Sequence, residues 1–170
     1  MEIICGWHAA NSILEKSFEE ENYITPLKLN YLVYLLSSEY LYLNGEGLFN
    51  EVCEKTELGP VVPSVYYKFN SFRNKVITNY AQDASGKTKG ISSDVFDECL
   101  SCVWEKFKNM DEDTTLSYIE SGNCYSRKEL GEILTEADML MDEIGRREEE
   151  LEVAKSYIKK LIPPKNTSNK

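Results

Sequence analysis

The sequence contains few of the residues and segments that several classes of protein require. Its single histidine, His8, supports no catalytic triad, and no apolar run approaches the roughly 18 residues that span a bilayer. Its first residues show no basic segment and no cleavage site, so we expect no secretory signal. The five cysteines are irregularly spaced, which is typical of free thiols rather than of a disulfide framework. These absences predict a cytoplasmic protein that does not enter the membrane.

Basic residues are also scarce relative to acidic ones. The chain has 19 Lys and Arg against 29 Asp and Glu, a net charge of −10. This balance argues against direct binding of nucleic acid, because contacts to the phosphate backbone need clustered Lys and Arg. Residues 129–152 hold ten acids and only two arginines, and therefore carry a net charge of −8. Such a segment is either a solvated helix face, an acidic surface for a basic partner, or an imitation of nucleic acid.

The residues that are abundant indicate one helical domain. Of the 170 residues, 42% are hydrophobic and 11% aromatic, which is globular composition. Apolar residues at three- and four-residue steps predict five to seven helices, of which the main ones cover residues 2–20, 26–44, 64–79, 93–107, 114–120 and 126–162. The helix over 26–44 is apolar nearly all round and is expected to be the central element. The predicted class is therefore all-α, with room for one short β-hairpin within residues 48–58.

The chain is expected to divide into a compact domain and a long acidic helix. Residues 1–125 form the domain, with a flexible link at about 82–92, and residues 163–170 form a disordered tail. Ser126 and Glu129 make a capping box that predicts the start of the last helix. Apolar residues then recur along it in a pattern that suggests a coiled coil, and hence a homodimer through this helix: Leu130, Leu134, Ala137, Met141, Ile144, Leu151 and Ile158.

Two stretches resemble the signatures of the Panacea antitoxin domain, a SocA/GepA-like family of phage and mobile-element proteins. Residues 24–35, ITPLKLNYLVYL, are similar to the family pattern iTPLKLqKLlYf, and residues 58–69, LGPVVPSVYYKF, to yGPVvpevYreF. Tyr31 stands where the family usually has Lys, and Thr56 where it usually has Trp. Most positions are typical of scaffold, in which a capped helix start with proline at N1 and a rigid turn at 59–63 support core leucines. These scaffold residues are Thr25, Pro26, Leu27, Leu29, Gly59, Pro60, Val61 and Pro63.

The resemblance implies a protein that is not an enzyme and that neutralises a toxin. Members of the family do so by direct contact or by delivering the toxin to a protease. An alternative follows from the acidic segment, namely a phage-encoded inhibitor of a nucleic-acid enzyme, such as a CRISPR nuclease, that mimics nucleic acid. Both interpretations predict another protein, basic in charge, as the partner.

Candidate partner-binding residues fall into two groups. Lys28 lies in the first turn of its helix, where the dipole disfavours a cation, so an acid or a main-chain carbonyl would hold it unless it is an ordinary surface lysine. Tyr31, Tyr34 and Tyr66 offer amphipathic contact area. We expect the acidic helix to set partner choice, mainly through the four carboxylates Glu148, Glu149, Glu150 and Glu152.

The sequence also contains one weak candidate for a metal site. Cys5 and His8, together with Cys99 and Cys102, would complete a Cys3His tetrahedron for zinc. Both pairs lie in predicted helices without a knuckle glycine, and free cysteine is a common core residue. No metal and no cofactor are therefore expected.

Overall fold

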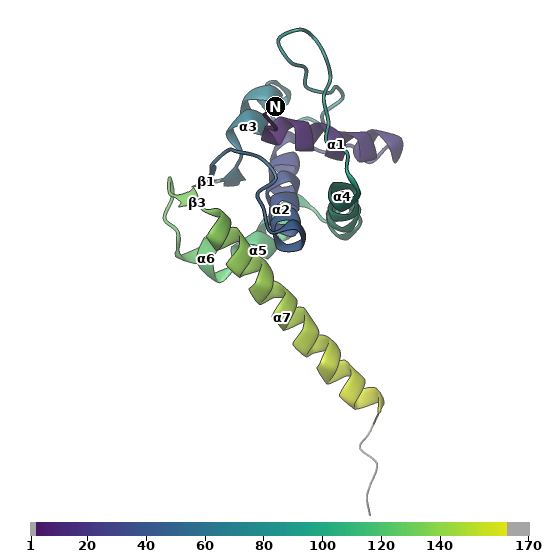
Figure 1. Cartoon of the computed structure of the whole chain (residues 1–170), viewed down its shortest axis with the longest axis vertical. Helices are drawn as coiled ribbons and strands as arrows, with labels where there is room; N and C mark the ends of the chain where they lie inside the picture. Colours follow the sequence, from purple (N-terminus) through teal and green to yellow (C-terminus); the bar gives the residue numbers. More distant parts are fainter. Residues whose placement is uncertain (1–2, 163–170) are drawn as a thin grey trace, which may run out of the picture.

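The computed structural model describes residues 3–162 and shows a mostly helical domain (Figure 1). The predicted all-α class with a short hairpin is confirmed. In chain order the helices within these residues are α1 (Gly6–Glu19), α2 (Pro26–Asn44), α3 (Pro63–Phe69), η1 (Asn70–Phe72), α4 (Asp94–Phe107), α5 (Glu112–Glu120), α6 (Asn123–Arg127) and α7 (Glu136–Leu161). None of them is both long and apolar enough to cross a membrane.

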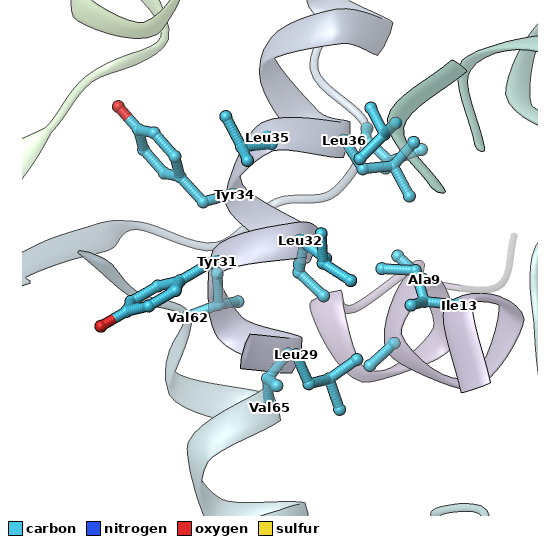
Figure 2. Packing of buried hydrophobic residues seen from close by; sticks show 14 of the residues in the cluster. Ala9, Ile13, Leu29, Tyr31, Leu32, Tyr34, Leu35, Leu36, Val62 and Val65 are labelled. Atoms are coloured by element: carbon cyan, nitrogen blue, oxygen red, sulfur yellow. The ribbon is translucent and has the colours of Figure 1, made fainter. Parts of the chain in front are cut away.

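Helix α2 is the centre of the domain, as its composition predicted. The hydroxyl of Thr25 accepts a hydrogen bond from the backbone N–H of Lys28 at 3.2 Å, and Pro26 occupies the first helical position. The helix packs against α1, α3, α4, α5 and α7. Figure 2 shows Leu32 pointing toward α1, while Tyr31 and Tyr34 extend from the opposite side of α2. The helix is apolar nearly all round because neighbouring helices pack against it on several sides.

The strands form one small antiparallel sheet in the order β2-β1-β3. These are β1 (Cys53–Thr56), β2 (Gly59–Val61) and β3 (Ile133–Leu134). The segment predicted as a rigid turn is therefore partly a strand, because Pro60 pairs with Lys55 in the β1–β2 hairpin. Proline is tolerated there because β2 lies at the edge of the sheet.

The predicted helix over residues 64–79 is wrong beyond Phe72. Arg73 adopts a positive φ of 55°, which ends the helical path. The chain then returns to the start of α2, where the N–H of Ile77 donates to the carbonyl of Ile24 at 2.8 Å. Ile77 is buried by this contact and Val76 is exposed, so the apolar spacing reflected tertiary packing rather than one helix face.

The last helix begins later than predicted. Thr135 and Asp138 form its capping box, and Ser126 lies inside the short helix α6. The intervening residues are extended because β3 pairs with β1, with Glu54 opposite Ile133. The predicted apolar seam fails at its start for the same reason, since its first two members, Leu130 and Leu134, precede α7.

The segment predicted as a flexible link loops out from the domain between α3 and α4 (Figure 1). The carboxylate of Asp83 accepts from the N–H groups of Ser85 at 2.8 Å and Lys87 at 3.0 Å, and Gln82 forms a β-bridge with Thr88. The segment thus has a defined turn, and its flexibility stays a prediction. The predicted tail, residues 163–170, lies outside the described residues.

Candidate functional site

Lys28 is buried and holds the end of another helix. Its Nζ donates to the carbonyl of Phe107 at 2.8 Å, to Thr115 Oγ1 at 2.8 Å, and to the carbonyl of Met110. Because Phe107 is the last residue of α4, the ammonium group lies at the negative end of that helix dipole. The prediction of a main-chain carbonyl partner is confirmed, and the surface-lysine interpretation is wrong.

The two signature stretches are bonded to each other. The Asn30 side chain accepts the N–H of Val62 at 3.1 Å, and the Tyr31 hydroxyl donates to the carbonyl of Leu58. Gly59 has a φ of +107°, and a Cβ there would lie 2.6 Å from the Tyr31 ring. Only glycine tolerates both the positive φ and the close approach of the Tyr31 ring. The two signature stretches therefore form one contact between α2 and the β1–β2 hairpin.

Burial also controls the ionisation of these groups. It lowers the pKa of Lys28 to about 8, although the charges of Asp111 and Glu112 oppose the decrease. It raises the pKa of Tyr31 to about 12 and raises that of Tyr34 as well. These three side chains lie in the interior, which corrects their expected placement on a partner surface, whereas Tyr66 is 49% exposed. Direct contact of the first three with a partner would require the core to open.

The first half of α7 is anchored to the domain by polar groups. Asp142 accepts the N–H groups of Cys124 at 2.7 Å and Tyr125 at 2.9 Å, at the start of α6. Arg147 donates to Glu143 at 3.0 Å and also pairs with Glu39 of α2. Acids in the segment predicted as a partner surface are therefore used to hold the fold.

Sequence analysis did not find this ionic anchor. Two signals were present: Glu39, which is the only acidic residue of the central helix, and the Arg146-Arg147 pair within the acidic run. Arg147 also lies 4.0 Å above the ring of Tyr42. Their pairing could not be read from the sequence because it joins residues more than 100 positions apart.

The second half of α7 projects away from the domain (Figure 1), and residues 148–162 are all exposed. Glu150 pairs with Lys106 of α4 at 2.6 Å, and Glu152 with Lys155 at 3.3 Å. Across residues 3–162 no ion pair involves Glu148 or Glu149. The four predicted carboxylates thus share one exposed helix segment.

The structure does not bring the four residues of the weak zinc candidate together among the described residues. His8 Nδ1 accepts the backbone N–H of Cys5 at 3.2 Å, Cys99 is buried, and Cys102 is exposed. Among the residues that the structure describes, no three His, Cys, Asp or Glu side chains are close enough to hold a metal ion. The cysteine pairs are spaced one helical turn apart but do not converge.

A cavity that sequence analysis did not predict lies between α2, the sheet and the start of α7. It measures about 450 Å³, and its lining includes Tyr34, Leu48, Cys53 and Met139. Burial raises the pKa of Cys53 to about 12, so this thiol is protonated near neutral pH. It therefore lacks the thiolate form that reactive cysteines use.

Comparison with known families agrees with this architecture. The family model "Antitoxin SocA-like, Panacea domain" matches residues 29–120, more than half of the chain. The match begins inside the first signature, includes the whole second signature and ends with α5, before α7. No curated protein and no solved structure matches the chain. The chain belongs to the SocA-like antitoxin family with a Panacea domain.

Proposed function

We propose that this protein is a cytoplasmic antitoxin that binds a basic toxin directly and neutralises it without catalysis. The observation that carries the proposal is the acidic face of α7 beyond Arg147, formed by Glu148, Glu149 and Glu152 on a helix anchored firmly to a Panacea domain. These carboxylates are exposed and lie where the fold does not need them.

The contrast with the other acids of the same helix supports this assignment. Asp142 and Glu143 are buried and satisfied by backbone N–H groups and arginines, so the fold accounts for them. Glu148 and Glu149 repel each other and receive no compensating ion pair from the described residues. A basic partner would relieve this repulsion, and the carboxylates would speed its approach at low salt.

Charge neutralisation on α7 tests the proposal. The variant Glu148→Gln, Glu149→Gln, Glu150→Gln, Glu152→Gln is co-expressed with the product of a neighbouring reading frame that is itself found to be toxic. We expect loss of growth rescue and weaker binding of the purified toxin, more so at low salt, with an almost unchanged melting temperature. A matched control removes the same charge from exposed positions elsewhere: Glu15, Glu19, Glu57 and Glu98. Equal binding by both variants would contradict the proposal.

The second candidate function is inhibition of a nucleic-acid enzyme by mimicry. The observation that favours it is the same row of carboxylates on a projecting helix, which resembles a short run of phosphates in charge. The co-expression experiment distinguishes this second function from the first. The wild-type protein would fail to rescue growth from the neighbouring toxin and would inhibit a DNA-binding nuclease.

A further inference from the structure

The cavity between α2, the sheet and the start of α7 is too large to be an ordinary packing defect. Protein interiors contain few voids larger than a water molecule. The volume of about 450 Å³ lies instead within the range of about 300–1,000 Å³ that small-molecule sites occupy. The buried residues that form its floor are mainly hydrophobic, namely Leu41, Leu48, Val62, Leu134 and Met139. A cavity of this size and lining is a candidate ligand site.

The cavity opens between the loop before β1 and the first turn of α7. Val52, Thr135 and Ala137 line it at positions that are exposed, so a small molecule can enter there without opening the core. Its floor includes Leu41 of α2 and Met139 of α7. A bound molecule would therefore touch both the central helix and the anchored half of α7.

Several polar side chains on the cavity wall already have their hydrogen bonds. The Ser37 hydroxyl donates to a carbonyl one turn earlier in α2 at 2.9 Å. The Glu51 carboxylate accepts the N–H groups of Gly6 at 2.6 Å and Ser64 at 3.0 Å. The Thr135 hydroxyl caps α7. These groups are committed to the fold.

The Tyr34 hydroxyl is different, because it is buried and has no partner. Tyr34 lines the cavity and is 1% exposed, and its ring extends from α2 with the hydroxyl at the far end (Figure 2). Within residues 3–162 no hydrogen bond involves this hydroxyl. The polar atoms left both unbonded and fully enclosed belong to Trp104 and Arg146, so the Tyr34 oxygen still borders open space. A buried donor without a partner costs free energy that a ligand in the cavity can recover.

We infer that this cavity binds a small, neutral, mainly apolar molecule that accepts one hydrogen bond from Tyr34, such as an aromatic ketone or ester. The apolar floor favours a hydrocarbon body, and the free hydroxyl requires an acceptor oxygen. Glu51 and Glu136 line the cavity and no Lys, Arg or His of the described residues does, so an anion meets repulsion without a counter-charge. A cation would lose its hydration against the apolar floor. The site goes beyond the proposed function and does not depend on it.

Titration of the full chain with acetophenone, followed by ¹H–¹⁵N NMR, tests the site. We expect saturable shifts of the amides of Leu48, Cys53 and Met139, with a dissociation constant on the order of 0.1–1 mM for so small a ligand. Ala137→Trp places a bulky side chain at the exposed mouth and should prevent binding, whereas Val153→Trp on the projecting half should not. No saturable shift of the cavity amides up to about 20 mM, or equal binding by the two variants, would overturn the inference.

Removal of the Tyr34 hydroxyl tests the hydrogen bond. We expect Tyr34→Phe to bind acetophenone about five- to tenfold more weakly, the effect of one lost hydrogen bond. Ethylbenzene has a similar shape but no acceptor, and should bind Tyr34→Phe and the wild type equally. Tyr31→Phe is the matched control, because Tyr31 does not line the cavity and its hydroxyl is bonded to Leu58. Circular dichroism checks that both variants are folded. Equal acetophenone affinity of Tyr34→Phe and the wild type, or an equal loss for ethylbenzene, would overturn the inference.

Discussion

The two halves of α7 use similar residues in opposite ways. In the anchored half, before Glu148, Asp142 and Glu143 are buried and fully bonded to α6 and to arginines. In the projecting half, Glu148 and Glu149 are exposed, and so are apolar side chains such as Leu151 and Ile158. One acidic sequence run therefore contains a structural segment and a segment that is available to partners. Charge density alone does not distinguish them, because the neighbours of each carboxylate decide its role.

The largest expected loss of stability comes from replacing Lys28, which is buried and makes three hydrogen bonds. Lys28→Met leaves the carbonyl of Phe107 and the hydroxyl of Thr115 without their buried donor. We expect the free energy of unfolding to fall by about 3 kcal/mol in chemical denaturation. Lys155→Met on the projecting half is the control and should change stability by less than about 0.5 kcal/mol. Similar losses of stability in both variants would contradict the distinction between buried polar residues that hold the fold and exposed residues of the projecting half.

Substitutions within α7 itself sharpen the comparison. Asp142→Ala removes the acceptor of two backbone N–H groups at the start of α6 and should cost about 2 kcal/mol. Glu149→Ala, only seven residues later, should stay within about 0.5 kcal/mol, because no ion pair of the described chain involves it. Urea denaturation of the two variants gives the comparison directly. A large loss for Glu149→Ala would show that the projecting half also supports the fold.

Alkaline pH should act on the core and not on the projecting half. Burial raises the pKa of Cys53 from 9.0 to about 12. Between these values the unfolded chain has lost a proton that the folded chain keeps, so stability falls by about 1 kcal/mol per pH unit for this thiol. Burial lowers the pKa of Lys28 from 10.5 to about 8. Between these two values the folded chain has lost a proton that the unfolded chain keeps, so this group raises stability with pH and opposes the effect of Cys53 up to about pH 10.5. Cys53→Ala should reduce the decline measured by denaturation at pH 9–11, and the exposed Cys102→Ala should not.

The smallest effect is expected from deleting the projecting half. A chain ending at Arg147 keeps the buried anchor, and among residues 3–162 it loses a single surface ion pair to the domain, Glu150–Lys106. We expect its free energy of unfolding to lie within about 1 kcal/mol of the full chain. Thermal melting followed by circular dichroism measures this change. A chain that no longer folds would contradict the division of α7 into an anchored and a projecting half.

Local sequence signals correctly predict the start of a helix when the residues that cap it are adjacent to it in the sequence. The Thr25-Pro26 start of α2 and the start of the helix predicted over residues 93–107 are both correct, since in each case the capping hydroxyl lies three residues before the N–H whose hydrogen bond it accepts. The predicted start of α7 is wrong because the sequence offers two capping boxes, at Ser126 and Thr135, and the helix begins at the second. The pairing of β3 with β1 selects the second box, and that pairing joins residues far apart in sequence.

The sequence by itself determined the helical class, the central position of α2 and the excess of acid near the C-terminus. Composition and apolar periodicity are sufficient for these features because they depend on residues close together in the chain. Only the tertiary structure decided that Lys28 serves the end of α4 and that Arg147 joins α7 to Glu39. It also decided where α7 leaves the domain, and hence which carboxylates remain exposed. The physical reason is that the partner of a buried charge is chosen by distance in space, which a single sequence does not record.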